Sequence, residues 1–188
     1  MLKLQNIRKK YGHKVIFENA SYEFNPGLYF LIGQNGAGKS TLLKIIAGID
    51  QGYDGVVEGK NIFYLPEKLI LPKELMTYQL INQYSKINDS MGSFIELVTS
   101  YNLENLPIKK LSKGMIQKVG IIISLLDKYN IILYDEPLEG LDEAAIKQFF
   151  IDLKKLKNTI VIMSIHEIPK GIRVNAQKIY IKDGKLCE

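Results

Sequence analysis

A glycine-rich loop between an apolar strand and a helix restricts the possible folds of this chain most strongly. Residues Gly33 to Ser40 read GQNGAGKS and match G-x-x-x-x-G-K-[ST]. The loop follows the apolar run Gly27–Ile32 and precedes a helical pattern that ends at Gly48. Glycines allow backbone N–H groups to surround phosphate oxygens, and a helix N-terminus favours negative charge. The pattern therefore predicts a phosphate-binding loop whose Lys39 reaches the terminal phosphates.

A second apolar strand ends in two carboxylates. Asp135 and Glu136 follow Ile131–Tyr134 and precede Pro137. Burying an unpartnered carboxylate is costly, so the pair indicates a cation or a proton transfer nearby. Asp135 is expected to join the Ser40 hydroxyl as a magnesium ligand. Glu136 is expected to orient and deprotonate an attacking water, and Pro137 to keep it out of a helix.

Apolar segments alternate with helical patterns along the rest of the chain. Strands are expected at residues 2–7, 15–24, 55–58, 62–65 and 159–163, and a strand with a turn at 177–184. Helices are expected from the end of the loop at 111–115 to about 128, and from about 142 to 157. Ser112 is a plausible N-cap for the first of these helices. Between residues 73 and 106 the apolar residues recur at helical spacing. The alternation predicts an α/β fold with a mainly parallel sheet.

Composition narrows the class of protein. The chain has 188 residues, 46% hydrophobic and 24% charged, which fits one soluble globular domain. The net charge of +5 is spread over the chain rather than gathered in a block, so nucleic-acid binding is not expected. No apolar run is long enough for a membrane span and the start does not resemble a signal peptide. With Cys187 as the single cysteine, these features favour the cytoplasm.

The loop LSKGM, Leu111 to Met115, distinguishes this chain from other proteins with a phosphate loop. It precedes a helix, lies upstream of the acidic strand, and resembles the LSGGQ signature of ATP-binding cassette (ABC) ATPases. Other elements resemble the same family in the same order. They are Tyr11 as the adenine-stacking aromatic, Gly33–Thr41 as Walker A, Ile131–Glu136 as Walker B, Glu139–Asp142 as the D-loop and His166 as the switch histidine.

The resemblance implies the fold and the site. It implies a P-loop NTPase fold over residues 1–188, with an N-terminal antiparallel β-subdomain and an inserted helical subdomain at about 67–112. The nucleotide contacts that it implies are Tyr11, Gly33, Gln34, Asn35, Gly36, Ala37, Gly38, Lys39, Ser40, Thr41, Ser112 and Gly114. Magnesium would be held by Ser40, Asp135 and Glu67, and the catalytic residues would be Glu136 and His166.

Three positions depart from the family pattern. Lys113 and Met115 stand where the signature has glycine and glutamine, although Ser112 and Gly114 remain. Glu67 stands where the family has a glutamine that contacts magnesium and water. A carboxylate there binds a cation more strongly but also repels phosphate.

The resemblance further implies a nucleotide-binding subunit of a transporter. Two cassettes, identical or different, would enclose two ATP–Mg units and drive a separate membrane-spanning permease from the inner face of the membrane. The form of the signature and the small size favour an ABC-2-type exporter. One alternative is a soluble ABC ATPase that acts on ribosomes, DNA or iron–sulfur assembly. A cassette that binds ATP without turnover is disfavoured because Glu136 and His166 are both present.

Overall fold

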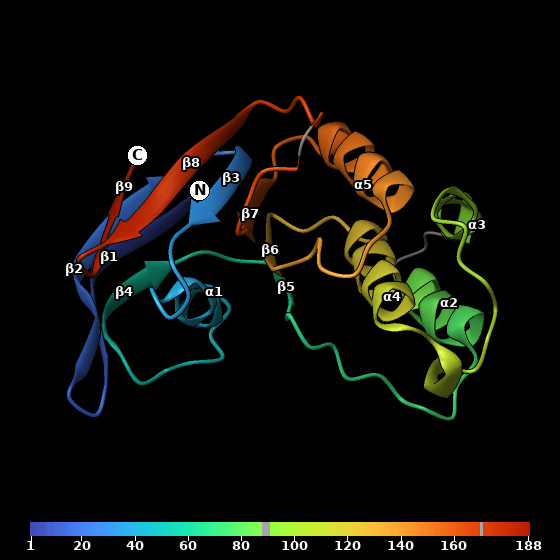
Figure 1. The fold of residues 1–188 in the computed structure, drawn as a ribbon, viewed down its shortest axis with the longest axis horizontal. Helices are drawn as coiled ribbons and strands as arrows, with labels where there is room; N and C mark the ends of the chain where they lie inside the picture. The colour runs from blue at the N-terminus through green and yellow to red at the C-terminus, as the bar shows by residue number, and fades with distance from the viewer. Residues whose placement is uncertain (88–90, 170) are drawn as a thin grey trace. The chain divides into compact units, whose positions relative to one another are not determined.

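The chain folds into two compact units. The computed structural model describes residues 1–87, 91–169 and 171–188. The first unit contains residues 1–64, 129–136 and 157–188, and the second contains residues 65–128 and 137–156 (Figure 1). The helical subdomain expected at about 67–112 lies within the second unit, which also includes two further helices.

An antiparallel sheet forms the N-terminal part of the first unit. Its strands are β1 (Leu2–Tyr11), β2 (Lys14–Phe24) and β4 (Asp54–Glu58), in the order β2-β1-β4. β1 pairs antiparallel with both neighbours. The turn between β1 and β2 uses Gly12 at a positive φ of 57°, which glycine adopts without steric cost. The expected N-terminal antiparallel β-subdomain is confirmed.

A larger, mainly parallel sheet has six strands in the order β5-β6-β7-β3-β8-β9. These are β3 (Gly27–Ile32), β5 (Ile62–Leu65), β6 (Ile131–Asp135), β7 (Ile160–Ser164), β8 (Ala176–Lys182) and β9 (Lys185–Cys187). β3 runs parallel to β7 and β8, β6 runs parallel to β7, and β9 runs antiparallel to β8. Every residue of β6 and β7 is buried, as their uninterrupted apolar sequences predict. The short strand β9 was not predicted.

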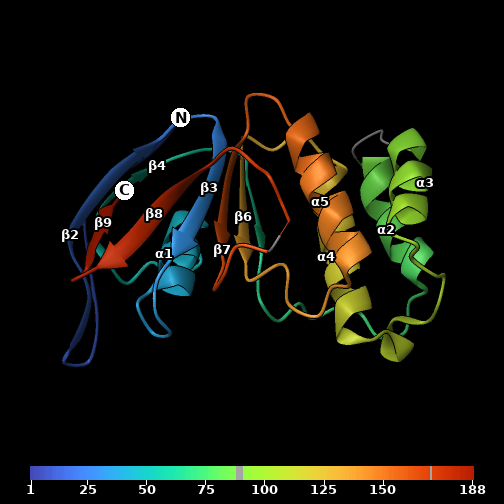
Figure 2. The same ribbon diagram turned by 45° about the horizontal axis from the view of Figure 1, so that its top comes forward.

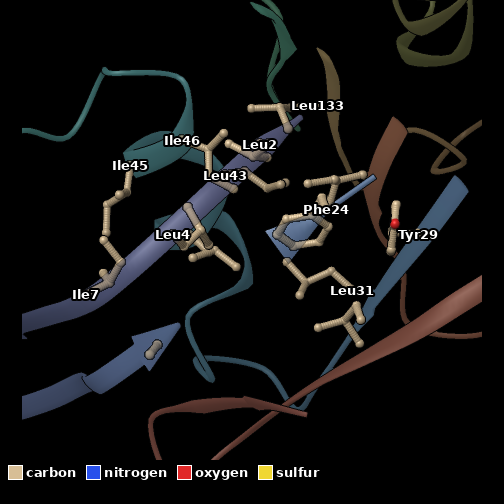
Figure 3. Close-up of a cluster of buried hydrophobic side chains, with 14 of the residues drawn as sticks. Leu2, Leu4, Ile7, Phe24, Tyr29, Leu31, Leu43, Ile45, Ile46 and Leu133 are labelled. Atoms are coloured by element: carbon tan, nitrogen blue, oxygen red, sulfur yellow. The ribbon is translucent and has the colours of Figure 1, made fainter. Parts of the chain in front are cut away.

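Helix α1 (Lys39–Ile46) packs into the core of the first unit. Figure 3 shows its Leu43, Ile45 and Ile46 among side chains of β1, β2, β3 and β6. Leu43 is fully buried, as are Leu2 and Leu133 from the strands. The apolar face of α1 thus fixes the helix, and with it the loop that precedes its first residue.

Helices form the second unit. They are α2 (Thr77–Ile87), α3 (Met91–Ser100), α4 (Lys113–Leu125) and α5 (Glu143–Lys155), with a short 3₁₀ helix at Ile108–Lys110. Figure 2 shows α2 and α3 side by side, and α4 contacts α2, α3 and α5. In the described part of the chain no helix combines the length and the apolar composition needed to cross a membrane.

Two helices end earlier than predicted. The prediction carries α4 to about residue 128, but it ends at Leu125 with Leu126 as C-cap. The Asp127 carboxylate accepts the Lys128 N–H at 2.6 Å, a local hydrogen bond that competes with a further helical turn. α5 ends at Lys155, because its C-cap Leu156 is already extended.

Candidate functional site

The phosphate loop, Gly33 to Ser40, connects β3 to α1. The Ala37 N–H donates to the Gln34 carbonyl at 3.1 Å and closes a turn. Gly36 and Gly38 have positive φ angles of 74° and 107°. A Cβ at Gly38 would lie 2.6 Å from Cγ2 of Ile16, so this position needs glycine for its conformation and for space. Gly38 is also the N-cap of α1 and provides no side-chain hydrogen bond to the helix.

Lys39 is the first residue of α1 and its side chain turns back into the phosphate loop. The ammonium donates to the Gly33 carbonyl at 2.8 Å and to the Gln34 carbonyl at 3.4 Å. Lys39 is buried, whereas Gln34 and Asn35 are exposed. The loop therefore places one buried cation beside backbone amides at a helix N-terminus, a combination that suits phosphate oxygens.

Ser40 and Asp135 meet, as the sequence predicts for two ligands of one cation. The Ser40 hydroxyl donates to Asp135 Oδ1 at 3.0 Å, and Asp135 is almost completely buried. Ser164 donates to the same oxygen at 2.8 Å, and Tyr64 donates to Oδ2 at 3.2 Å. A hydroxyl and a carboxylate are hard oxygen ligands that fit magnesium, which keeps several waters and uses few protein ligands.

Glu136 follows directly and has a strained backbone. Its φ is 52°, which is uncommon for a residue other than glycine. Its N–H donates to the Ser164 hydroxyl at 2.8 Å. Pro137 was expected to keep Glu136 out of a helix. In the structure Glu136 lies in the left-handed region and not in an extended conformation.

The Glu136 carboxylate contacts the predicted switch histidine. Nε2 of His166 lies 2.9 Å from Oε1 of Glu136, with 52% and 20% of the two side chains exposed. His166 comes two residues after β7 and Glu136 directly after β6, and these strands are parallel neighbours. The carboxyl ends of parallel strands meet at one edge of the sheet, which explains how residues 30 positions apart along the chain come together.

Tyr11 ends β1 and is held by two other side chains. Its hydroxyl donates to Asp50 Oδ2 at 2.8 Å, and the Lys9 ammonium lies 4.6 Å from its ring centroid. Lys9 is buried and pairs with Asp50 Oδ1 at 2.6 Å. This hydrogen bond holds the pKa of the Asp50 carboxyl below its usual range. Tyr11 itself is half exposed, so stacking on adenine stays a prediction for an accessible ring.

The signature loop, Leu111 to Met115, lies in the second unit. The Ser112 hydroxyl accepts the Met115 N–H at 3.2 Å, which confirms Ser112 as the N-cap of α4. A Cβ on Gly114 would overlap with the carbonyl oxygen of Gly140. Gly114 is thus required for close packing between the signature loop and the segment Glu139–Asp142.

Charged pairs reinforce this packing. Lys113 pairs with Glu139, and Lys118 donates to Asp142 Oδ2 at 2.8 Å. Asp142 is also the N-cap of α5, where its Oδ1 accepts the Ala145 N–H at 2.8 Å. The lysine hydrogen bond, followed by the amide, lowers the pKa of the Asp142 carboxyl.

The predicted site residues thus fall into two groups. The first unit brings together Ser40, Asp135, Glu136 and His166 next to Lys39 in the phosphate loop, and it also carries Tyr11. Ser112, Gly114 and Glu67 belong to the second unit. Glu67 is half-buried and follows Pro66, so its part in metal binding stays a prediction.

Sequence reasoning missed Tyr64 and Ser164, the two further donors to Asp135. Neither belongs to a motif, since one is an aromatic in a short strand and the other a serine at the end of a buried strand. The signal that could have found Ser164 is strand register. If β6 and β7 are parallel neighbours, Asp135 pairs with Ser164 as the last residue of each strand.

Comparison with known proteins gives one consistent family. The family model described as "ABC transporter" matches residues 17–139. An uncharacterized ABC transporter ATP-binding protein of Methanocaldococcus jannaschii is 34% identical over 98% of this chain and 75% of its own length. A lantibiotic transport ATP-binding protein, SrtF of Streptococcus pyogenes, is 33% identical over 99% of this chain and 89% of its own. A zinc import ATP-binding protein, ZnuC of Buchnera aphidicola, is 30% identical over 99% and 82%.

Solved structures agree on the fold. The ATP binding subunit of an ABC transporter superposes with a TM-score of 0.86 at 24% identity, covering 99% of this chain and 88% of that one. An ATP-binding cassette in a dimeric post-hydrolysis state with ADP and Pi gives a TM-score of 0.81 at 24% identity, covering 99% and 96%.

Proposed function

The chain belongs to the ABC transporter family of ATP-binding proteins, and we propose that it drives a separate membrane-spanning permease as one cassette of a dimer. As a member of the family it is an ATPase that binds ATP with Mg²⁺. The observation that carries the proposal is the cluster of Ser40, Asp135, Glu136 and His166 beside the phosphate loop.

The phosphate loop and the side chains of Asp135 and Tyr11 have proposed tasks in nucleotide binding. Lys39 neutralises the terminal phosphates, and the backbone amides from Gly36 to Thr41 hold phosphate oxygens at the N-terminus of α1. Ser40 and Asp135 would hold magnesium, which supplies positive charge where the phosphates develop negative charge. Tyr11 offers its half-exposed ring to adenine.

Glu136 is the proposed general base. Glu136 directly follows Asp135 in the chain and is therefore attached next to the Ser40–Asp135 pair. His166 orients the Glu136 carboxylate through the 2.9 Å contact. A positioned carboxylate that takes a proton from water contributes typically about 10²- to 10⁴-fold to a rate. His166, half exposed beside it, can also donate a hydrogen bond to a phosphate oxygen.

Glu136→Gln tests this assignment, because it keeps the shape of the side chain and removes its basicity. We expect ATP to bind with nearly unchanged affinity and turnover to fall about 10²- to 10⁴-fold. Glu143→Gln makes the same chemical change at a highly exposed residue of α5 and should leave turnover unchanged. Wild-type turnover by the Glu136→Gln variant would show that another group activates the water.

The proposed active form is a dimer in which each signature loop completes the nucleotide site of the partner. The proposal is supported by the position of Ser112 and Gly114 in a loop outside the first unit, whose own phosphate loop already supplies the amides for one nucleotide. The Glu136→Gln variant should shift from monomer to dimer by light scattering when ATP and magnesium are added. A variant that stays monomeric with saturating ATP would contradict dimerisation of the isolated subunit.

We propose that the segment from about Glu67 to Tyr84 docks the permease. Ile70 is 92% exposed in an apolar stretch, Leu69–Leu71, an unfavourable position for a large aliphatic side chain in water. Leu69 is anchored nearby, since its Cδ2 lies 2.9 Å from the position of a Cβ on Gly120 of α4. Docking of this segment on the permease would hold the cassette at the inner face of the membrane.

Ile70→Glu tests the docking surface. The variant should fold and bind ATP as the wild type does but fail to co-purify with the permease from membranes. Ile151→Glu, which makes the same change at a half-exposed isoleucine of α5 outside the proposed docking segment, is the matched control. Equal recovery of permease with Ile70→Glu would remove this segment from the interface, and recovery of ribosomes instead would favour a soluble ABC ATPase.

The direction of transport is proposed to be export. The form LSKGM of the signature supports this. Of the relatives, one is named a lantibiotic transport ATP-binding protein and another a zinc import ATP-binding protein. ATP-dependent release of cargo from loaded cells that carry the cassette and its permease would support export. Uptake under the same conditions would contradict it.

A further inference from the structure

We propose that Ser164, the last residue of β7, is a positioning residue for ATP hydrolysis that holds both carboxylates at the end of β6. The inference rests on the proposed role of Glu136 as base. Ser164 pairs with Asp135 in the register of the parallel strands β6 and β7. Its hydroxyl accepts the N–H of Glu136 at 2.8 Å and donates to Asp135 Oδ1 at 2.8 Å.

The two hydrogen bonds depend on each other. A hydroxyl has one proton and two lone pairs, so donation to Asp135 turns a lone pair of Ser164 towards the Glu136 amide. Ser164 is fully buried, and water does not compete for either bond. One small side chain thus links the backbone of the proposed base to the carboxylate of the proposed metal ligand.

Glu136 needs such a restraint because its backbone conformation is unfavourable. A left-handed conformation is unfavourable for a residue other than glycine unless its surroundings hold it, and the following Pro137 restricts Glu136 further. The Ser164 hydroxyl bonds the amide of that strained residue. Without this bond we expect Glu136 to relax and its carboxylate to leave its place beside His166.

Asp135 depends on Ser164 in a second way. Its Oδ1 accepts from both Ser40 and Ser164, while Oδ2 accepts from Tyr64. If Ser40 and Asp135 turn to a common cation, the bond between them is exchanged for ligation. The Ser164 bond then keeps Oδ1 oriented, so loss of Ser164 should raise the magnesium concentration needed for activity.

The test compares Ser164→Ala with Ser164→Thr in the purified full chain. A misplaced catalytic group can cost about 10²-fold in rate, so Ser164→Ala should lower kcat by about 10- to 100-fold. The KM for ATP should change less than about threefold, because the phosphate loop is untouched. Calorimetric titration of magnesium into the chain bound to a non-hydrolysable ATP analogue should give a weaker magnesium affinity than in the wild type. Ser164→Thr keeps the hydroxyl and should recover most of kcat.

A matched control separates positioning from general damage to a buried core. Ser124 is also fully buried and donates to the Ile121 carbonyl within α4, so Ser124→Ala removes a similar hydroxyl and should keep kcat. A kcat within threefold of wild type for Ser164→Ala, or a Ser164→Thr variant no better than alanine, would overturn the inference. The assignment of Glu136 as the base is tested separately by Glu136→Gln, so its failure can be told apart from failure of the inference about Ser164.

Discussion

The phosphate loop and the signature loop both place glycine and serine at the N-terminus of a helix, but their backbone groups are satisfied differently. At α1 the N-cap is Gly38, a left-handed residue without a side chain to accept the first amides. At α4 the N-cap is Ser112, whose hydroxyl accepts the Met115 N–H. The first loop therefore leaves amides for a ligand, whereas the second satisfies an amide from its own chain.

This difference in capping indicates which of the two loops can bind an anion by itself. Lys39 adds a buried cation to the open amides of α1, and the exposed pair of Lys113 with Glu139 lies at the start of α4. We therefore expect the phosphate loop to hold nucleotide in a single chain. The signature loop is expected to add affinity only where a partner brings a phosphate to it.

Among the tests that compare the two loops, the largest expected effect comes from the cation of the phosphate loop. Lys39→Met removes charged hydrogen bonds of about 1.5–3 kcal/mol, so ATP should bind about 10- to 100-fold more weakly by calorimetry. Lys14→Met removes an equal charge from an exposed lysine that lies 3.5 Å from the Gly36 carbonyl, and it should change affinity little. Similar losses for both variants would mean that net charge, not the Lys39 position, governs binding.

The next effect concerns the glycine of the signature loop. Gly114→Ala forces a Cβ into the Gly140 carbonyl and should lower the free energy of unfolding by about 1–3 kcal/mol, an overpacking cost, without any nucleotide present. Gly12→Asn adds a side chain to a hairpin turn with open space and should be nearly neutral. Chemical denaturation measures both. An unchanged midpoint for Gly114→Ala would show that this glycine is not required for packing, which would leave nucleotide contact as its role.

A smaller effect separates the two tasks of Ser112. Ser112→Ala removes the N-cap and should cost about 1 kcal/mol of stability. Ser112→Asp keeps a capping oxygen but adds a negative charge where the partner's phosphate is expected. It should unfold like wild type and yet lose ATP-dependent dimerisation in the Glu136→Gln background. Dimerisation at wild-type strength by the aspartate variant would contradict a phosphate contact at Ser112.

The smallest expected effect is on the pH dependence of stability. The comparison is between Asp50 in the first unit and Asp142 in the second. The lysine hydrogen bonds lower the pKa of Asp50 and of Asp142, so each carboxylate stabilises the folded chain above the unfolded pKa of about 3.9. The contribution is lost as pH falls through the lowered pKa. Because Asp142 is 58% exposed and Asp50 only 16%, Asp50→Asn should weaken this acid dependence more than Asp142→Asn. Denaturant midpoints between pH 3 and 7 check this order.

The parts of the site that the sequence predicted are those with local causes. The conformation of Gly36 and Gly38 follows from a short pattern, and the cap at Ser112 follows from a serine before a helical stretch. Asp135 could be assigned to Ser40 because the motif chemistry of a metal site requires a second ligand. The glycine conformations and the cap depend on a few neighbouring residues, whereas the pairing of Ser40 with Asp135 was predicted from the chemistry of the two motifs.

The unpredicted contacts are those that depend on register between distant strands. Tyr64 and Ser164 reach Asp135 only because β5 and β7 flank β6, and no spacing in the sequence states that order. The Lys9–Asp50 pair joins β1 to the segment after α1, again through the tertiary fold. β9 has three residues, too few for an alternating pattern, and its pairing with β8 defines it.

Because Gly114 and Gly140 approach closely, neighbouring positions of the signature loop should differ strongly in the substitutions that they tolerate. Lys113 has half of its side chain in solvent, so a random library of this chain should accept many residues there. At position 114 any side chain meets a backbone oxygen, and backbone cannot move aside as a flexible side chain does. Selection for folding alone, without ATP, should therefore retain glycine at 114 and leave 113 variable. The glycine of the signature motif would then reflect a packing requirement in addition to the proposed contact with nucleotide.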